Sequence, residues 1–346
     1  MKVSKNMIVT DTVPGPGWNF DSILAELTGE RWTASHGGLK YKLSGRKEKI
    51  RRYINFLIFP FRLFLHRNEI DNLIALQQYY GIFYAFYCLL FHVKKKNYCM
   101  VMTFIYNRRK GAAGALQYRF IKKIINSKYL DCIVVYSEYE KKYYEKLFGV
   151  PAGKLLSCRL GLEDLTGGIK RKKTEPYILS AGRSNRDYEF LFRALRGHPY
   201  EVKIVCDSID RKSEENFTVY KNTYYEDFFQ MIAECFCVVI ALKDKRISSG
   251  QLVILQAKQF AKPVIVTESR AVEEYIKDGV DGFIIRKSEG ELVEKICMLS
   301  EDPILYRRMC EASRKSYENS FSLYALGEQI VNCLKKTGRL YDENTR

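Results

Sequence analysis

Short apolar segments alternate with longer amphipathic segments along this chain. The short segments are rich in valine, isoleucine and phenylalanine, which favour strands. They predict strands at 7–10, 72–76, 100–105 and 131–136 in the first half, and at 177–181, 202–206, 236–241 and 263–266 in the second. Strands that alternate with helical segments are typical of parallel α/β layers.

The longer segments repeat their apolar residues at helical spacing. They predict helices at 84–93, 115–126, 187–196, 225–234, 251–260 and 270–277, and a helical end from about 289 to 337. Residues 72–93 carry no charge. We interpret them as a strand, a polar turn at 77–81 and a helix, because the helical part is too short to span a bilayer.

A chain of 346 residues, 47% of them apolar, suits two domains that each have a core. The polar segment 163–175 contains two glycines and a basic run, and Pro176 follows it, so we predict the division there. In open parallel sheets, ligands bind at the carboxyl ends of the strands. Functional residues are therefore expected in the loops that follow strands.

The net charge of +17 is concentrated in the first half. Residues 40–130 hold 19 basic and 3 acidic side chains, whereas residues 171–346 hold 29 and 27. A one-sided basic region indicates an anionic partner: a membrane surface, a nucleic acid or an anionic substrate. Residues 46–67 combine seven basic residues with aromatic and aliphatic clusters, and further basic residues follow at 93–110.

The composition of 46–67 and 93–110 suits the interface of an anionic membrane. A helix that packs on the sheet and leaves a solvated basic edge is an equally open hypothesis. The ten cysteines form no C-x-x-C pair, and the N-terminus shows no secretory leader. We expect reduced thiols in a cytoplasmic protein, with a peripheral location on the inner face of the membrane as an extension of that prediction.

Two loops after predicted strands carry residues suited to a phosphate. In TDTVPGPGWNF, residues 10–20, Gly15 and Gly17 allow close approach of the backbone to a ligand, although a tight turn explains them equally well. In SAGRSNRDYEFL, residues 180–191, Arg183 and Arg186 offer forked donors for a diphosphate, with a solvated ion pair to a neighbouring acid as the alternative.

The segment RISSGQLVILQAKQFAKPVIV, residues 246–266, joins a polar turn, a helix and a strand. Hydroxyls and free N–H groups at a helix start favour an anion, although a serine there is also a common N-cap. The residues at this start are Ser248, Ser249, Gly250, Gln251 and Leu252. Gln256 is either a hydrogen-bonding group for a pair of hydroxyls or a surface glutamine. Asp207, after a strand, and Tyr225, at a helix start, complete the candidate ligand-binding residues.

The second half resembles the donor-binding domain of retaining glycosyltransferases of family 4, which have the GT-B fold. The resemblance covers roughly residues 130–335. It rests on the order and spacing of YILSAGRSNRDYEFLFRAL, YYEDFFQMIAECFCVVIAL and SSGQLVILQAKQFAKPVIVTESRAVEEYIKDGVDGFII. It implies two Rossmann-like domains facing a central cleft. We place an acceptor-binding domain at 1–165, a donor-binding domain at 166–322, and a C-terminal helix, 323–346, that returns to the first domain.

The resemblance also implies roles for individual residues. The arginine that contacts the donor diphosphate in this family maps to Arg183. The lysine expected five residues later is Tyr188 here, so Arg186 is the candidate second cation. Two glutamates of the family, spaced E-x7-E, fall at Ser248 and Gln256. Gln256 can still bind ribose hydroxyls, and Ser248 would face the sugar. The family's histidine after strand 100–105 is absent, and its role is unassigned.

The reaction implied is transfer of a sugar, with retention, from a nucleotide-diphosphate sugar to a saccharide or polyprenyl-linked acceptor in cell-surface polysaccharide synthesis. We expect no metal and no other cofactor. Arg183 and Ser248 are the catalytic candidates. Arg183, with Arg186 as a second candidate, and the amides at 249–252 would stabilise the leaving diphosphate, which would itself accept the proton of the acceptor.

Other hypotheses remain. A different GT-B enzyme, such as a sugar-nucleotide epimerase or a phosphorylase, would share the fold. A nucleic-acid-binding protein would explain the basic aromatic region, although no recognised motif for it appears. A non-catalytic partner subunit would explain the two missing glutamates.

Overall fold

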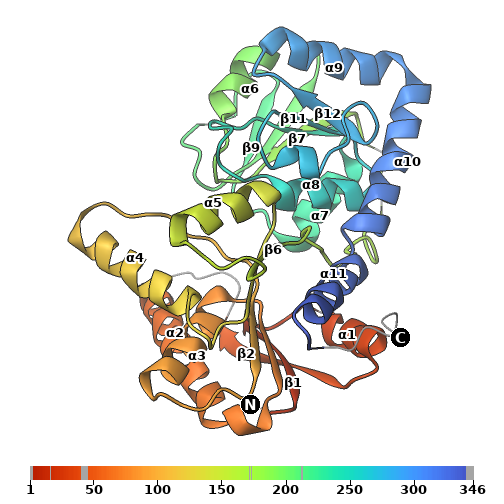
Figure 1. The fold of residues 1–346 in the computed structure, drawn as a ribbon. Coiled ribbons are helices and arrows are strands. Elements are labelled where there is room, and N and C mark those ends of the chain that lie inside the picture. Colours follow the sequence, from red (N-terminus) through yellow and green to blue (C-terminus); the bar gives the residue numbers. More distant parts are fainter. Residues whose placement is uncertain are drawn as a thin grey trace. The chain divides into compact units, whose positions relative to one another are not determined.

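The computed structural model describes residues 3–15, 17–39, 46–170, 172, 174–211 and 213–339. The chain forms two compact units, one made of Met1–Cys158 with Gly327–Arg346 and the other of Arg159–Leu326. Each unit has a central sheet with flanking helices (Figure 1). The chain therefore leaves the first unit shortly before the polar segment 163–175 and re-enters it within the last helix.

The first unit contains a parallel sheet with the strand order β2-β1-β3-β4-β5-β6. Its strands are β1 (Asn6–Thr12), β2 (Trp32–Leu39), β3 (Asn72–Ala75), β4 (Tyr98–Val101), β5 (Cys132–Val135) and β6 (Leu155–Ser157). Its helices are α1 (Phe20–Thr28), α2 (Arg46–Leu65), α3 (Gln78–Leu90), α4 (Gly111–Ile125) and α5 (Glu138–Phe148), with a 3₁₀ turn at Arg67–Glu69.

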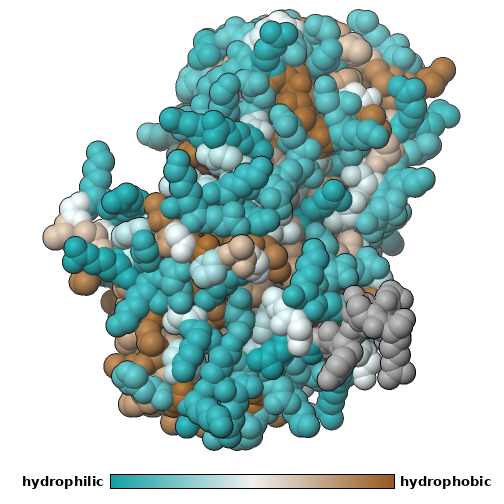
Figure 2. All heavy atoms as spheres, viewed as in Figure 1, coloured by the Kyte–Doolittle hydropathy of each residue, from teal (hydrophilic) through white to brown (hydrophobic). Residues whose placement is uncertain are grey.

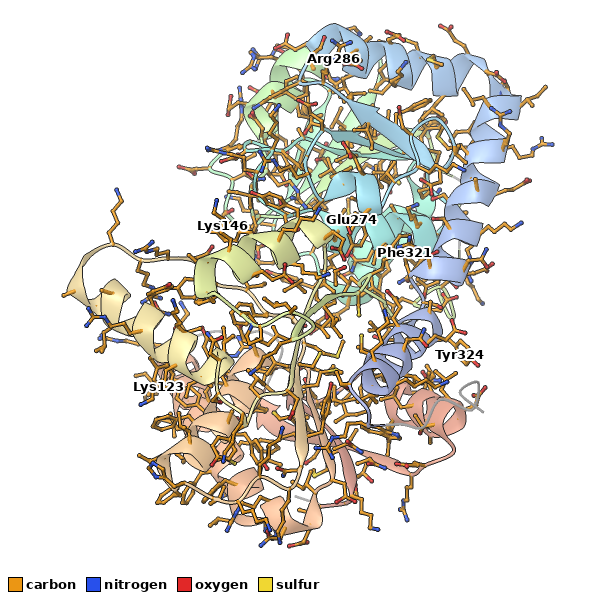
Figure 3. All side chains as sticks on the ribbon, viewed as in Figure 1. Lys123, Lys146, Glu274, Arg286, Phe321 and Tyr324 are labelled. Atoms are coloured by element: carbon orange, nitrogen blue, oxygen red, sulfur yellow. The ribbon has the colours of Figure 1, made fainter. Side chains whose placement is uncertain are left out.

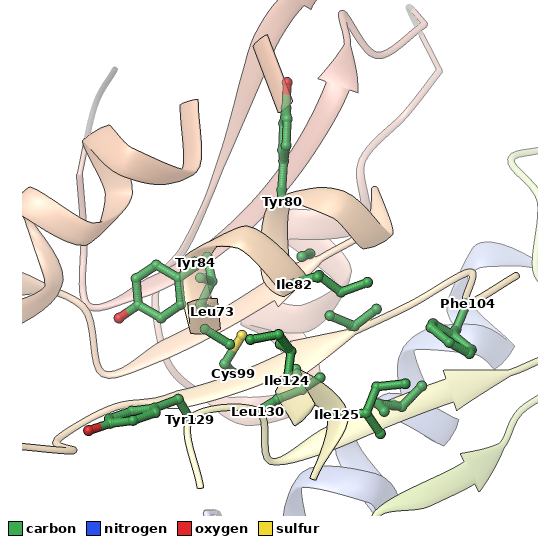
Figure 4. Packing of buried hydrophobic residues seen from close by; sticks show 14 of the residues in the cluster. Leu73, Tyr80, Ile82, Tyr84, Cys99, Phe104, Ile124, Ile125, Tyr129 and Leu130 are labelled. Atoms are coloured by element: carbon green, nitrogen blue, oxygen red, sulfur yellow. The ribbon is translucent and has the colours of Figure 1, made fainter. Parts of the chain in front are cut away.

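The core of this unit lies between the sheet and its helices. Leu73 of β3 and Cys99 of β4 pack with Ile82 of α3 and Ile124 of α4, all almost fully buried (Figure 4). The apolar, β-branched strand segments bury both faces, as parallel sheets require.

The second unit contains a parallel sheet with the strand order β12-β11-β10-β7-β8-β9. Its strands are β7 (Tyr177–Ala181), β8 (Glu201–Val205), β9 (Phe217–Tyr220), β10 (Cys237–Ile240), β11 (Val264–Thr267) and β12 (Gly282–Ile285). Its helices are α6 (Tyr188–Leu195), α7 (Tyr225–Glu234), α8 (Gln251–Gln259), α9 (Glu289–Glu301) and α10 (Pro303–Ser320), with a 3₁₀ turn at Val272–Glu274. The last helix, α11 (Leu323–Lys336), spans the division at 326/327.

Alternate residues of each strand in the second unit enter two separate cores. Ile178, Val239 and Ile265 belong to one cluster, whereas their neighbours Leu179 and Val238 belong to the other. Because successive side chains of a strand point to opposite faces, the two clusters cover the two faces of the sheet.

The strand order reverses at one place in each sheet. In the first unit this switch point lies between β1 and β3, and in the second it lies between β7 and β10. Loops that leave the carboxyl ends of strands at such a point move apart, which is why ligands bind there in open α/β sheets.

The structure corrects several predictions about strands. β4 ends at Val101, short of the predicted strand 100–105, and Thr103 has a left-handed φ of 56° that interrupts extended backbone. The strands that the sequence pattern missed are β2, β6, β9 and β12, and each lies at the edge of its sheet.

Two predictions about turns and helices are wrong. The polar turn at 77–81 is the start of α3, which Gln77 caps by accepting a hydrogen bond from the Tyr79 amide. Gly81 allows α3 to pack closely on Val101 of β4, since a Cβ at this position would lie 2.3 Å from Cγ2 of Val101.

The predicted helix 270–277 contains only the short 3₁₀ turn Val272–Glu274. The ring of Tyr275, just after this turn, stacks on Phe321 with ring centroids 5.3 Å apart. Figure 3 labels Glu274, the last residue of the turn, and Phe321.

The helical end at 289–337 consists of three helices. Asp302, which caps α10 next to Pro303, and Phe321–Ser322 separate them. No helix in the described part of the chain has the length and apolar character needed to cross a membrane.

A buried ion pair anchors α8. Nζ of Lys258 lies 2.6 Å from Oδ2 of Asp281 and 2.9 Å from Oγ of Ser316, and the lysine side chain is fully buried. Burial lowers the pKa of Lys258, and the Asp281 carboxylate opposes that shift. The charged lysine therefore depends on Asp281 as its counter-ion.

Asp281→Asn should reduce the free energy of unfolding by about 3–5 kcal/mol at neutral pH, because it leaves a buried ammonium unpaired. Ser316→Ala, which removes one neutral partner, should cost about 1 kcal/mol. In Asp281→Asn the folded pKa of Lys258 falls below its unfolded value, so the unfolded state binds more protons and stability should recover as pH rises between the two. Urea denaturation measures the two losses of stability and the pH dependence. Equal losses for Asp281→Asn and Ser316→Ala would contradict the ion pair.

Candidate active site

Two loops meet at the switch point of the second unit. One follows β7 and covers residues 182–187, and the other follows β10 and covers residues 241–250. The backbone joins them directly, because the Asp187 amide donates to the Ala241 carbonyl at 2.9 Å.

Asn185 fixes these loops to each other. Its side chain accepts from the Asp244 amide at 2.9 Å and donates to the Asp244 carbonyl at 2.8 Å and to Oγ of Ser249 at 3.1 Å. Its φ is 58°, in the left-handed region that asparagine tolerates better than most residues. The sequence pattern missed this residue, since an asparagine in a polar loop gives no sign of a contact 59 or 64 residues away.

The two arginines of the first loop have different surroundings. Arg183 is exposed, and no residue in the described ranges pairs with its guanidinium. Arg186 is 7% exposed, and its Nε and Nη1 donate to the carbonyls of Ala181 and Ser184 at 2.8 and 2.9 Å. Arg186 thus holds the turn from inside, whereas Arg183 is free to meet a ligand.

Arg186 is a buried cation that forms no ion pair with a described carboxylate. Desolvation lowers its pKa, and no carboxylate among the described residues forms an ion pair with it. A Cβ at Gly182 would lie 2.7 Å from Nη2, so the glycine backbone approaches the guanidinium closely. The turn therefore lies directly against a buried positive charge, which favours an anion nearby.

Tyr188 occupies the position at which the family resemblance implied a lysine. Its side chain is 9% exposed, and its hydroxyl donates to the Gly182 carbonyl at 2.6 Å. Burial raises the pKa of this hydroxyl, so it stays neutral. The position supports the turn and supplies no second cation.

The start of α8 has open hydrogen-bond donors. Its N-cap is Gly250, with φ 99° and no side chain to cap the helix. The first amides of a helix have no intrahelical acceptor, so those of Gln251 and Leu252 can meet an anion. The hypothesis of a serine N-cap is wrong. Oγ of Ser248 accepts a hydrogen bond from Nε2 of Gln251, and Oγ of Ser249 accepts one from Asn185.

Gln256 lies further along the same helix and is 9% exposed, so the hypothesis of a surface glutamine is wrong. Its amide forms no hydrogen bond with any residue that the structure describes. Gln259, on the same helix, is also buried, but its Nε2 donates to the Glu163 carbonyl at 2.9 Å and its Oε1 accepts from the Leu165 amide at 3.1 Å. The amide of Gln256 is not among the described polar atoms that are both fully buried and without a partner, so it stays accessible to a small polar ligand.

Comparison with known proteins adds to this geometry. Residues 168–316 match the family model of glycosyl transferases group 1. The matched segment lies within the second unit, which is therefore similar to that family. No curated protein matches its sequence.

The chain has the fold of solved structures over nearly its whole length. HepE from Anabaena has a TM-score of 0.67 at 14% identity and covers 96% of this chain and 99% of its own. A glycosyltransferase from Rickettsia africae has a TM-score of 0.67 at 14% identity, with 97% and 100% covered. WaaG, a glycosyltransferase of lipopolysaccharide biosynthesis, has a TM-score of 0.58 at 14% identity, with 96% and 99% covered. The expected GT-B fold is confirmed.

The remaining candidate residues belong to other loops and helices. Oδ1 of Asp207, after β8, accepts from the Asn222 amide at 2.7 Å, and its second oxygen accepts from the Tyr224 hydroxyl. Tyr225, the first residue of α7, is 57% exposed. Gly15 and Gly17 are exposed in the loop between β1 and α1 of the first unit.

Replacing the two buried glutamines of α8 by methionine should have opposite effects on stability. Gln256→Met removes an unpaired amide and should raise the free energy of unfolding by about 1 kcal/mol. Gln259→Met leaves two backbone groups without their partner and should lower it by about 2 kcal/mol. Denaturant titration of both variants measures the contrast. A loss for Gln256→Met as large as that for Gln259→Met would mean that Gln256 has a structural partner.

Proposed function

We propose that this chain is a retaining glycosyltransferase of the family 4 type. It transfers a sugar from a nucleoside diphosphate sugar to a saccharide or lipid-linked saccharide acceptor in cell-surface polysaccharide synthesis. The observation that carries the proposal is the side chain of Gln256, which is 9% exposed and forms no hydrogen bond with a described residue, on a helix that no side chain caps at its start. An amide can bind the vicinal hydroxyls of a ribose, and an uncapped helix start favours the diphosphate beside it.

Other groups at the switch point support a donor of this kind. Arg183 is exposed and unpaired among the described residues, and the buried charge of Arg186 lies behind the same turn. Structures of HepE contain UDP, UDP with glucose, and UDP-glucose. UDP-glucose is therefore the first donor to test.

The proposed chemistry depends on position and charge. As the bond from the anomeric carbon to the phosphate oxygen breaks, negative charge develops on the diphosphate. Arg183 and the amides of Gln251 and Leu252 would stabilise that charge. In same-face transfer the leaving phosphate accepts the proton of the acceptor hydroxyl, so the residues need only align the two substrates. We propose that this set of donors acts without a metal ion.

A screen of nucleoside diphosphate sugars tests the function. The purified chain is incubated with each donor, with and without EDTA, and the released nucleoside diphosphate is quantified. Turnover of one donor that EDTA leaves unchanged, with a product whose anomeric configuration in NMR matches the donor, supports the proposal. The absence of both turnover and thermal stabilisation with every donor contradicts it. Release of a sugar phosphate that requires inorganic phosphate would indicate a phosphorylase instead.

Arg183→Ala should lower kcat about 100-fold, the usual effect of removing one donor to a charge that develops in the transition state. Because this side chain is exposed and unpaired in the described structure, the free energy of unfolding should not change. Arg193→Ala is the matched control, because Arg193 is also exposed but pairs with Glu289 on the surface. Turnover by Arg183→Ala near that of the control would exclude the proposed diphosphate role.

Helix α2 of the first unit has two apolar faces. One face is buried against the sheet and α3 and consists of Phe56, Phe59, Pro60, Leu63 and Phe64. The opposite face is between 37% and 68% exposed and consists of Ile50, Tyr53, Ile54, Leu57, Ile58, Phe61 and Leu65. Both sets follow helical spacing. Figure 2 shows hydrophobic side chains at the surface of this part of the first unit.

The exposed face of α2 continues onto the end of α3 and has basic borders. Phe61 of this face contacts Tyr87 of α3 with ring centroids 5.1 Å apart, and Phe91, just after α3, is 54% exposed. Exposed basic residues flank the stripe: Arg46, Lys47, Lys49, Arg51 and Arg62. A helix that only packed on the sheet would account for its buried face but not for this one. We propose that the exposed face binds an anionic membrane, which matches both its apolar stripe and its positive borders.

Flotation with vesicles tests this contact. The chain should float with vesicles that contain phosphatidylglycerol, bind less at high salt, and bind poorly to phosphatidylcholine alone. The double variant Ile54→Glu/Ile58→Glu should remain unbound. Leu116→Glu, at a 71% exposed position of α4, should float like the unaltered chain. If the unaltered chain does not float with anionic vesicles, the proposed membrane contact is wrong.

A further inference from the structure

A second group of polar side chains lies at the switch point of the first unit. Asp11 is the last residue but one of β1, and Gln77 lies just beyond the neighbouring strand β3. Arg52 and Asn55 reach the same place from the inner face of α2, and Tyr80 reaches it from α3. The sequence pattern shows no motif at this group, but Asp11 lies at the end of a strand, where ligands bind in open α/β sheets.

Asp11 is 7% exposed, and its donors converge on one oxygen. Oδ2 accepts from Nε and Nη2 of Arg52 at 3.1 and 2.7 Å and from Nε2 of Gln77 at 3.3 Å. No group among the described residues donates to Oδ1. A carboxylate held rigidly by one oxygen therefore keeps its second oxygen available to a ligand.

The next layer of the group fixes α2 against the sheet. Nδ2 of Asn55 donates to the Gly37 carbonyl at 3.1 Å, and its Oδ1 accepts from the Tyr80 hydroxyl. A Cβ at Gly37 would lie 2.0 Å from that hydroxyl, so a larger residue would displace it. In Figure 4 the hydroxyl of Tyr80 points away from the other labelled side chains of the cluster.

The inner face of α2 changes character along its length. Near the carboxyl ends of the strands it presents Arg52 and Asn55, and one turn later it presents Phe56, Phe59 and Leu63 to the core. Apolar packing alone would stabilise the first part as it does the second, at lower cost than a buried ion pair. A rigid polar group at a switch point, with a free carboxylate oxygen and a partly exposed arginine, is instead what a polar ligand requires.

We propose that Asp11, Arg52 and Gln77 bind hydroxyl groups of the saccharide on a lipid-linked acceptor. Neighbouring sugar hydroxyls both donate and accept: one donates to Oδ1 of Asp11, and its neighbour accepts from a free N–H of Arg52. This inference rests on the proposed function, of which it specifies the acceptor. The same helix presents an apolar stripe to the membrane, so the saccharide site lies about one helix diameter, roughly 10 Å, from the lipid surface.

Binding to an array of neoglycolipids tests the proposal without knowledge of the natural acceptor. The array presents different saccharides on one common lipid, next to the same saccharides on a lipid-free linker. The unaltered full-length chain should bind a subset of the saccharides on lipid. Asp11→Asn, which keeps the shape of the side chain, should weaken that binding about tenfold or more. Asp71→Asn, at an exposed aspartate of the same unit, is the control for lost charge and should bind normally.

Two further measurements separate binding from structure. Arg52→Gln and Gln77→Leu should also weaken saccharide binding, whereas hydrolysis of the donor by all three variants should stay within about twofold of the unaltered chain. Normal binding by Asp11→Asn overturns the proposal, as does binding that merely follows the free energy of unfolding across the variants. Failure of the unaltered chain to bind any saccharide overturns it too. If no donor is hydrolysed but the array result holds, the proposed transfer fails and the saccharide site stands.

Discussion

Hydrogen bonding between parallel strands is the constraint on which both units depend. Crossovers between parallel strands keep one hand, so a reversal of strand order sends the two adjoining helices to opposite faces of the sheet. The loops at that point separate and leave backbone and polar groups uncovered. The reversals lie at β1/β3 and β7/β10, and the polar groups around Asp11 and around Asn185 lie at these two places.

The sequence pattern reveals those strands that are buried on both sides. β7, β10 and β11 are short runs that are buried throughout, whereas β8 alternates buried and half-buried residues, and the pattern identifies all four. The edge strands lack this signal because they have one neighbour and partial cover. β9 has one fully buried residue of four, and β2 contains a histidine and two glycines. Strand order itself cannot be read from periodicity, since it depends on contacts between distant segments.

In the candidate site too, local sequence shows some features, whereas others depend on contacts between distant segments. The motif around Gln256 can be recognised from sequence, but its burial without a partner appears only once α8 is packed. The two arginines of one loop look equivalent in the sequence, yet one side chain turns inward and the other outward. Asn185 and Asp11 gain their importance from partners dozens of residues away, so no local pattern could reveal them.

The path of the chain also bears on how the protein forms during synthesis. The second unit is one continuous segment, Arg159–Leu326, whereas the first requires both Met1–Cys158 and the chain from Gly327 onward. Gly327 itself packs closely on α1, where a Cβ would lie 2.7 Å from Ile23, and Ile330 and Leu334 are buried. Domains fold as they emerge from the ribosome. The unit translated first must therefore wait for the final helix, and the unit translated second completes its fold before it.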